Sequence, residues 1–183
     1  MLACVFIHKQ KVIHRDLKLG NLFLDEKMQV MVGDFGLAAM ILYDGEKKRT
    51  VCGTPNYIAP EILDANQGHS YEVDYWAIGV ILYTMLHGRP PFECPEVKNT
   101  YQRIKTCDFS FPSNNDQFSA EAQDFIMRCL NVDYSRRMNL KDMLEHDFFT
   151  KHTNMPQQMP IQTLVCPPAL EFIETFGPPE NLK

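Results

Sequence analysis

The spacing of hydrophobic and polar residues changes along the chain and predicts short strands followed by several helices. The apolar run 2–7 gives way to a polar stretch, as the last turns of a helix do when its apolar face ends. Val12-Ile13 then predicts a short strand or turn. Two apolar segments, 21–24 and 29–32, are separated by polar residues, which predicts two strands joined in a hairpin.

The later part of the chain consists of a loop followed by helices. Between residues 37 and 56 neither a helical nor a strand period holds, so we expect a long loop, and long loops in compact domains are usually functional. A helix that runs to Leu86, with Ser70 or Asp74 as its N-terminal cap, is apolar enough to be the buried centre of the domain. Helical spacing predicts three further helices, at 96–106, 119–130 and 140–145.

The composition shifts after Phe149. Six of the twelve prolines fall between residues 150 and 183, and helical periodicity disappears there. We therefore expect one domain over 1–149 and a proline-rich linker or tail over 150–183. The fold class that the pattern predicts is mainly α with a small β-hairpin.

Charge and cysteine spacing exclude several functional classes. The 183 residues carry 18 basic and 23 acidic side chains, so no broad positive surface is expected for nucleic acid or anionic membranes. The longest apolar stretch, 75–86, is shorter than the roughly 20 residues that cross a bilayer. The six cysteines lie far apart without zinc-site spacing, which is typical of the reduced thiols of an intracellular protein.

Two motifs at a fixed spacing indicate phosphoryl transfer. Residues 14–21 read His-Arg-Asp-Leu-Lys-Leu-Gly-Asn, and Asp34-Phe-Gly follows after a hairpin-sized gap. Both match the catalytic-loop and magnesium-binding motifs of protein kinases. Either motif alone could be a turn or strand end in an unrelated fold, but the combination is too specific for that interpretation.

The chemistry of phosphoryl transfer assigns a role to each residue type. Catalysis is mostly positioning and charge neutralisation, so the site needs one oriented base and several groups that handle magnesium and phosphate. Asp16 is expected to be the base that accepts the proton of a substrate hydroxyl, and Lys18 to face the transferring phosphate. Asn21 and Asp34 offer the hard oxygen ligands that Mg²⁺ prefers, so we expect ATP and Mg²⁺ as cofactors.

Residues 53–61, Gly-Thr-Pro-Asn-Tyr-Ile-Ala-Pro-Glu, resemble the end of a kinase activation segment. Together with the lysine of the catalytic loop, Thr54 resembles the serine/threonine class, and Gly53 and Thr54 are expected to contact the protein substrate. Glu61 would be a buried carboxylate that needs a cationic partner. Resemblance to kinases makes Arg137 that partner, and the alternative is that Arg137 is a solvated surface residue.

Thr50 lies in the predicted loop, directly after the basic run 47–49. A phosphate on Thr50 could accept charge-assisted hydrogen bonds from Arg15 and so tie the loop to the catalytic base. We expect Thr50 to be an activating phosphosite, modified by an upstream kinase that prefers basic residues before it. The alternative is a plain loop threonine beside a solvated basic run.

Within the kinases the sequence resembles the polo-like family, and the stretches that carry this resemblance are 17–24, 43–46 and 50–61. The resemblance implies that Phe23 forms the floor under adenine and that Asp74 bonds the backbone of the catalytic loop. It also makes 159–168 similar to the segment that leads toward the polo boxes. The nucleotide-site residues that it implies are Lys18, Leu19, Gly20, Asn21, Phe23 and Asp34.

Other kinase motifs do not occur in this sequence. None of the nine glycines stands two positions from another, so there is no G-x-G-x-x-G loop, and there is no V-A-I-K lysine. We expect a kinase C-terminal lobe with the N-terminal lobe absent, which would bind ATP poorly alone. The alternative is a non-catalytic half-kinase that binds substrates or regulators. Family resemblance implies serine/threonine protein substrates, a mitotic role, and a place in the cytoplasm or nucleus, at the centrosome or spindle.

Overall fold

The computed structural model describes residues 1–27, 29–64, 66–112 and 118–151. Its helices are α1 (Leu2–Lys9), α2 (Glu72–His87), α3 (Val97–Thr106), α4 (Ala120–Cys129), α5 (Leu140–Glu145) and α6 (Asp147–Thr150). Its strands are β1 (Val12–Ile13), β2 (Leu22–Leu24), β3 (Val30–Val32) and β4 (Ala39–Met40), and its 3-10 turns are η1 (Leu19–Asn21), η2 (Pro60–Leu63) and η3 (Tyr134–Arg136). The predicted class, mainly α with a small β-hairpin, is confirmed.

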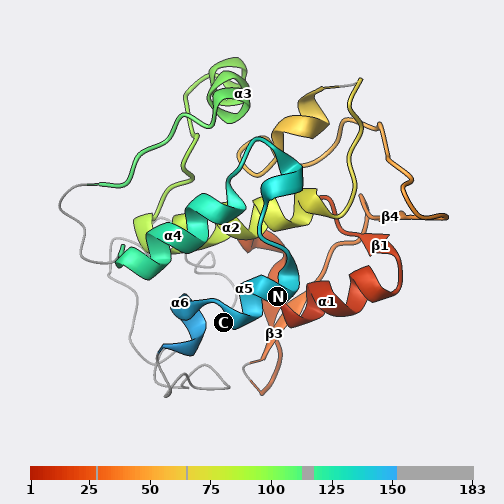
Figure 1. The fold of residues 1–183 in the computed structure, drawn as a ribbon, viewed down its shortest axis with the longest axis horizontal. Helices are drawn as coiled ribbons and strands as arrows, with labels where there is room; N and C mark the ends of the chain where they lie inside the picture. The colour runs from red at the N-terminus through yellow and green to blue at the C-terminus, as the bar shows by residue number, and fades with distance from the viewer. Residues whose placement is uncertain (28, 65, 113–117, 152–183) are drawn as a thin grey trace, which may run out of the picture.

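Helix α2 is the central element, and α4 packs along it (Figure 1). Trp76 and Val80 on α2 are fully buried, as expected for a helix that is apolar on most of its surface. The close approach of α4 depends on Gly79, because a Cβ there would lie 2.5 Å from the Cβ of Cys129. The helix ends at Gly88, whose φ of 85° is the left-handed conformation that glycine adopts at a helix C-terminus.

The prediction that Ser70 or Asp74 caps α2 is wrong. Tyr71 occupies the N-cap position and makes no side-chain cap hydrogen bond. Asp74 lies in the first turn, fully buried, and its carboxylate accepts hydrogen bonds from the catalytic-loop backbone instead of from its own helix. The sequence pattern could not distinguish these two uses of an aspartate, because the partner amides lie about 60 residues away.

Two small antiparallel sheets flank the catalytic loop. Strands β2 and β3 form the predicted hairpin with Leu22 opposite Val32. Strand β1 pairs with β4, with Val12 opposite Met40. The expectation of an irregular loop over 37–56 is therefore wrong at β4, because two residues are too few to produce a strand period and the partner strand is distant in sequence.

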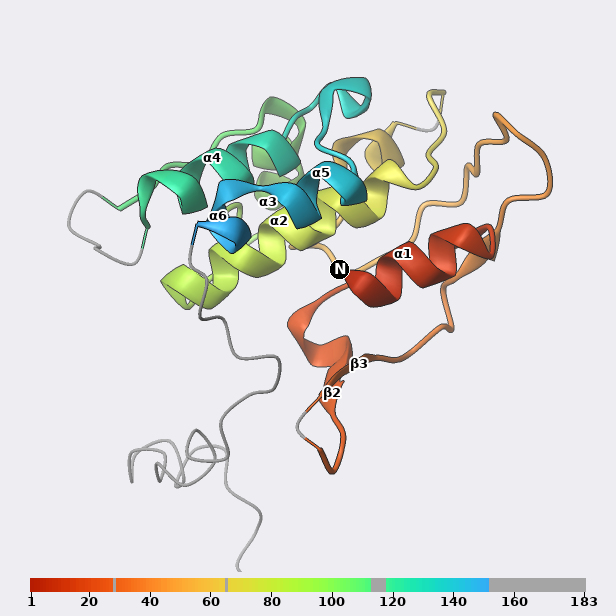
Figure 2. The same cartoon turned by 60° about the horizontal axis from the view of Figure 1, so that its bottom comes forward.

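Helices α4, α5 and α6 lie on one side of α2, and the β2–β3 hairpin lies on the other. Figure 2 shows α4, α5 and α6 along one side, and α1 with the β2–β3 hairpin along the other. One core cluster forms around α2, η2, α3 and the segment that follows α3, with Trp76 stacked on Phe92. A second cluster joins α1, α2, α4 and α5 through residues such as Cys4, Ala77 and Phe125. The catalytic loop leaves β1 between these two clusters.

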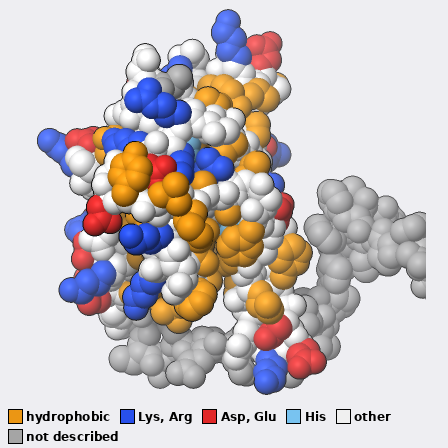
Figure 3. Space-filling view, turned by 90° about the vertical axis from the view of Figure 1, so that its right-hand side faces the viewer, with side chains coloured by type: hydrophobic (Ala, Val, Ile, Leu, Met, Phe, Trp, Pro, Cys, Tyr) orange, Lys and Arg blue, Asp and Glu red, His pale blue; other side chains and the backbone are white. Residues whose placement is uncertain are grey.

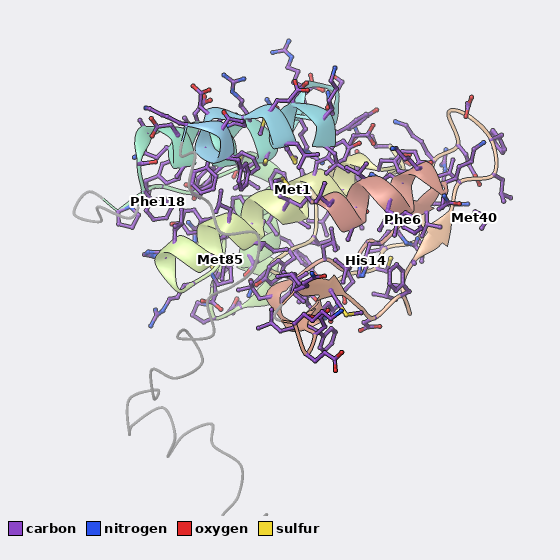
Figure 4. All side chains as sticks on the ribbon, turned by 90° about the horizontal axis from the view of Figure 1, so that it is seen from below. Met1, Phe6, His14, Met40, Met85 and Phe118 are labelled. Atoms are coloured by element: carbon purple, nitrogen blue, oxygen red, sulfur yellow. The ribbon has the colours of Figure 1, made fainter. Side chains whose placement is uncertain are left out.

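Several large hydrophobic side chains remain exposed. Phe23 and Met31 of the hairpin are 53% and 55% exposed. Phe6 on α1 and Met40 on β4 are also exposed and lie toward the same end of the molecule (Figure 4), and hydrophobic side chains run across the face seen in Figure 3. Residues of α1, the hairpin, α2, α4, α5 and α6 also line an apolar groove of about 730 Å³.

Two further sequence-based expectations concern membrane-spanning segments and the proline-rich linker. Within the described ranges, no helix combines the length and the apolar character needed to cross a membrane. The predicted linker over 150–183 falls outside the described residues from 152 onward and stays a prediction.

Candidate active site

The catalytic loop between β1 and β2 is fixed by one buried carboxylate. Asp74 Oδ2 accepts the backbone N–H of His14 at 2.9 Å, and Oδ1 accepts that of Arg15 at 2.9 Å. Arg15 has a φ of 67°, a conformation that costs a non-glycine residue energy and persists only where surrounding contacts enforce it. His8 at the end of α1 also bonds Asp74 Oδ2, at 2.7 Å. The loop is therefore held in a strained shape by α2.

The Asp16 carboxylate lies at the centre of a closed hydrogen-bond network. Oδ1 accepts the N–H of Thr54 at 2.9 Å and its hydroxyl at 2.7 Å. Oδ2 accepts from Lys18 Nζ at 2.8 Å and from Asn21 Nδ2 at 3.2 Å. Lys18 Nζ also donates to Thr54 Oγ1 at 2.8 Å. Four of the predicted site residues therefore meet at one carboxylate.

This network changes the acidity of Asp16. Burial of the carboxyl opposes ionisation, but the hydrogen bonds from Lys18 and Thr54 outweigh it and hold the pKa of Asp16 below its ordinary value. An ionised carboxylate is the form that accepts a hydrogen bond from a substrate hydroxyl. The geometry thus holds the Asp16 carboxylate, a hydrogen-bond acceptor, beside the ammonium group of Lys18.

Asn21 precedes β2 and Asp34 follows β3, so both lie at the same end of the hairpin, where the Gly33 N–H donates to the Asn21 carbonyl at 3.0 Å. Asn21 is buried and its amide N–H₂ also donates to the carbonyl of Asp16 at 2.9 Å, which leaves its side-chain oxygen outside these bonds. Asp34 is exposed, with a φ of 60°. The Asp34 carboxylate accepts the Gly36 N–H at 3.3 Å through Oδ1. An amide oxygen and an exposed carboxylate are ligand types that fit Mg²⁺. Across the described ranges no group of three or more His, Cys, Asp or Glu forms a cation site.

His14 connects the catalytic loop to the segment before Asp34. Its Nδ1 accepts the N–H of Asp16 at 3.3 Å, so Nε2 carries the proton that is donated to the Gly33 carbonyl at 3.0 Å. His14 lies beneath α1 (Figure 4), and its ring is 5.0 Å from that of Phe35. A Cβ on Gly33 would lie 2.8 Å from Phe23, so this glycine makes room for the aromatic ring.

The predicted nucleotide-site residues lie around this centre. Leu19 and Gly20 belong to η1 and are exposed, and Phe23 on β2 is exposed beside Gly33. Lys18 and Asn21 contact Asp16, as described above.

Glu61 and Arg137 form a buried ion pair. The guanidinium bonds both carboxylate oxygens, at 2.6 and 2.7 Å, and neither side chain is more than 2% exposed. Arg137 also donates to the carbonyls of Glu72 and Asn131 and lies over the Trp76 ring. The pair joins η2 to the turn after α4 and so fixes the end of the segment that contains Thr54.

Within the described part of the chain, no hydrogen bond joins Arg15 and Thr50. The Arg15 guanidinium donates to the Leu37 carbonyl at 2.6 Å, and Thr50 is exposed. The backbone of Gly53, by contrast, lies against Arg15: its φ is 118°, and a Cβ there would meet the Arg15 carbonyl at 3.0 Å. The expected contact of Thr50 with Arg15 stays a prediction for the phosphorylated chain.

Sequence reasoning missed three residues near this site. His8 bonds Asp74, but nothing in its spacing distinguishes it from other polar residues at a helix end. His69 is buried, its Nε2 has no hydrogen-bond partner among the described residues, and burial lowers its pKa to about 4. Tyr134 of η3 contacts Lys47, which lies 87 residues earlier in the chain, within the activation segment that begins in the predicted loop 37–56 and ends at Glu61. Only the tertiary structure shows which groups these residues contact.

Comparison with known proteins gives a consistent picture. Residues 1–149 match a family model described as the protein kinase domain. Similar relatives are the probable serine/threonine-protein kinase CCRP1 of Zea mays, 51% identical over 176 residues, which are 96% of this chain and 28% of the relative. PLK1 of Xenopus laevis, a serine/threonine-protein kinase, is 49% identical over 166 residues, which are 91% of this chain and 27% of the relative. The cell cycle serine/threonine-protein kinase CDC5/MSD2 of Saccharomyces cerevisiae is 43% identical over 172 residues, which are 93% of this chain and 24% of the relative. The chain thus spans less than a third of the length of these relatives.

Proposed function

The chain belongs to the protein kinase family and, within it, to the polo-like serine/threonine kinases, and we propose that its catalytic loop transfers phosphate from ATP to serine and threonine hydroxyls of protein substrates. The observation that carries this proposal is the Asp16 network. An ionised carboxylate is held by Thr54, Asn21 and Lys18 inside a strained loop. Such a group is a positioned acceptor for a hydroxyl proton.

Each residue of the network has a proposed task. Asp16 orients the substrate hydroxyl and accepts its proton late in the transfer. Lys18, already beside Asp16, offsets negative charge on the transferring phosphate. Asn21 and Asp34 would hold Mg²⁺, which when bound neutralises charge on the ATP phosphates. Thr54 and Gly53 would contact the protein substrate, because they lie next to Asp16 and Arg15.

The proposal includes regulation at Thr50. Its exposure in the activation segment leaves the hydroxyl accessible to an upstream kinase that recognises the basic run 47–49. A phosphate there would recruit Arg15, whose guanidinium donates to the Leu37 carbonyl. A cell-cycle role, which the name of the Saccharomyces cerevisiae relative supports, belongs to the same proposal. A place in the cytoplasm or nucleus, at the centrosome or spindle, is proposed from the family resemblance alone.

A chimera tests the catalytic proposal. Residues 1–151 replace the matching segment of Xenopus laevis PLK1, and phosphate transfer to a serine peptide is measured. Asp16→Asn is expected to lower kcat about a hundredfold or more, because the base is removed. Asp44→Asn, at a fully exposed aspartate far from Asp16 in sequence, is the matched control.

Two results would contradict the proposal. One is equal activity of the chimera and its Asp16→Asn variant. The other is a folded chimera that binds ATP and substrate but transfers no phosphate, which would instead favour the non-catalytic binding role. Thermal unfolding of each chimera establishes that loss of activity does not come from loss of fold.

A further inference from the structure

The basic run 47–49 is held against the domain rather than projecting into solvent. Lys48 and His69 form two backbone hydrogen bonds, Lys48 N–H to His69 O and His69 N–H to Lys48 O, both at 2.8 Å. Gly68 allows this approach, because its φ is 67° and a Cβ there would lie 3.0 Å from the Cβ of Lys47. His69 itself is 2% exposed, so the loop that contains Gly68 and His69 is anchored in the core.

The side chains of the run are engaged as well. Lys47 Nζ lies 4.3 Å from the centroid of the Tyr134 ring and donates to its hydroxyl. Lys48 Nζ pairs with Glu46 at 2.7 Å, and Glu46 also accepts the N–H of Leu42 at 2.6 Å. Arg49 makes no ion pair within the described part of the chain. Two of the three basic groups are thus already bound.

Tyr134 and Lys47 also line the same small recess. Its lining includes Glu72, Glu61 and His69. A lysine over an aromatic face gains about 0.5 to 1 kcal/mol at an exposed site, which corresponds to a two- to fivefold population shift. This contact is therefore strong enough to bias a flexible segment, yet weak enough for an incoming protein to displace.

We propose that Tyr134 is a positioning residue that anchors the activation segment through Lys47 and thereby limits access of other proteins to the run 47–49. The anchor exists independently of catalysis, but its regulatory meaning rests on the proposed modification of Thr50. An upstream kinase that reads the basic run must first release Lys47 from Tyr134. Loss of the anchor should accordingly make both the run and Thr50 easier to reach.

Limited trypsinolysis of the full chain measures the anchor directly, since trypsin cleaves after Lys47, Lys48 and Arg49. Tyr134→Leu is expected to speed cleavage within the run about two- to fivefold, because cleavage follows the population of the released segment. Tyr134→Phe keeps the ring and should have a smaller effect. Tyr43→Leu, at an exposed tyrosine of the same segment, is the matched control.

A second variant and an internal reference distinguish release of the run 47–49 from unfolding of the whole domain. Gly68→Ala should release the run from the other side, because the added Cβ meets Lys47 and the Lys48 carbonyl. Cleavage after Arg103 and Lys105 in α3 reports global opening, so the ratio of cleavage in the run to cleavage in α3 is the measured quantity. An unchanged ratio in both Tyr134→Leu and Gly68→Ala would overturn the proposal.

A last measurement distinguishes this proposal from the one on which it rests. The initial rate of Thr50 phosphorylation by a purified kinase that prefers basic residues is compared for the wild-type chain and Tyr134→Leu. A two- to fivefold rise supports both the anchor and its regulatory meaning. Faster tryptic cleavage without any phosphorylation of Thr50 would establish the anchor and refute Thr50 as the phosphosite.

Discussion

Replacing Arg137 by methionine should destabilise the fold far more than replacing its neighbour Arg136. Arg137 is buried and bonds both oxygens of Glu61 at 2.6 and 2.7 Å. Its removal leaves a carboxylate 2% exposed without a partner. Breaking a buried pair in this way costs about 3–5 kcal/mol. Arg136 forms an exposed pair with Asp133, so Arg136→Met should leave the free energy of unfolding nearly unchanged.

The chain contains its own probe for this measurement. Its single tryptophan, Trp76, is fully buried and lies 5.0 Å from the Arg137 guanidinium, so urea unfolding can be followed by its fluorescence. The double variant Glu61→Met with Arg137→Met removes the stranded charge. It should be more stable than Arg137→Met alone, although carbonyls that Arg137 satisfied stay unpaired.

Two outcomes would refute this reasoning. If Arg137→Met costs no more than Arg136→Met, burial does not govern the strength of the pair. If the double variant is less stable than Arg137→Met, the penalty does not come from the uncompensated charge of Glu61. The first comparison uses the same substitution at two adjacent positions, so its effects on the unfolded chain largely cancel.

Three further predictions concern the site, the buried histidine and the surface. Thr54→Val should lower kcat/KM of the chimera about ten- to a hundredfold, because Asp16 loses a charge-assisted hydrogen bond; Thr54→Ser should retain activity, and equal losses in both would contradict this role. Burial lowers the pKa of His69 to about 4, so the folded state resists protonation that the unfolded chain accepts near its ordinary 6.5. Stability should therefore fall as pH drops from 6.5 to 4, by up to about 3 kcal/mol, and urea midpoints of His69→Phe should lack this slope. The chain should bind a hydrophobic dye through its apolar groove, and Met85→Glu at the groove should weaken binding; absence of dye binding by the wild-type chain would contradict an accessible groove.

The helical core could be predicted from the sequence because its signals are local. The helix predicted at 140–145 has the observed bounds. The helix predicted at 96–106 begins one residue before α3, and the helix predicted at 119–130 extends one residue beyond α4 at each end. Hydrophobic spacing within each segment is sufficient for this. Strand β4 was missed because its two residues are defined only by pairing with β1. The residues 147–150 of α6 were missed because four residues hold little more than one helical period.

The candidate site shows the same division between local and tertiary information. The motif 14–21 identified Asp16, Lys18 and Asn21, and the structure gathers them because they lie within one loop. Thr54 joins them from 38 residues away, and its exact partners could not be read from spacing. The strained φ of Arg15 is likewise invisible in the sequence, because it follows from two hydrogen bonds to a buried aspartate on α2.

The Asp16 network implies a link between regulation and chemistry. Its carboxylate accepts four donors, which occupies the roughly four lone-pair sites available, so a substrate hydroxyl must displace one of them. Lys18 and Asn21 belong to the strained catalytic loop, whereas Thr54 belongs to the activation segment, so the Thr54 hydroxyl is the partner that can yield. That segment is fixed downstream by Glu61 and upstream by Lys47, with Thr50 exposed between them. A phosphate that draws Thr50 toward Arg15 would therefore act on the same short stretch that places the Thr54 hydroxyl on the Asp16 carboxylate.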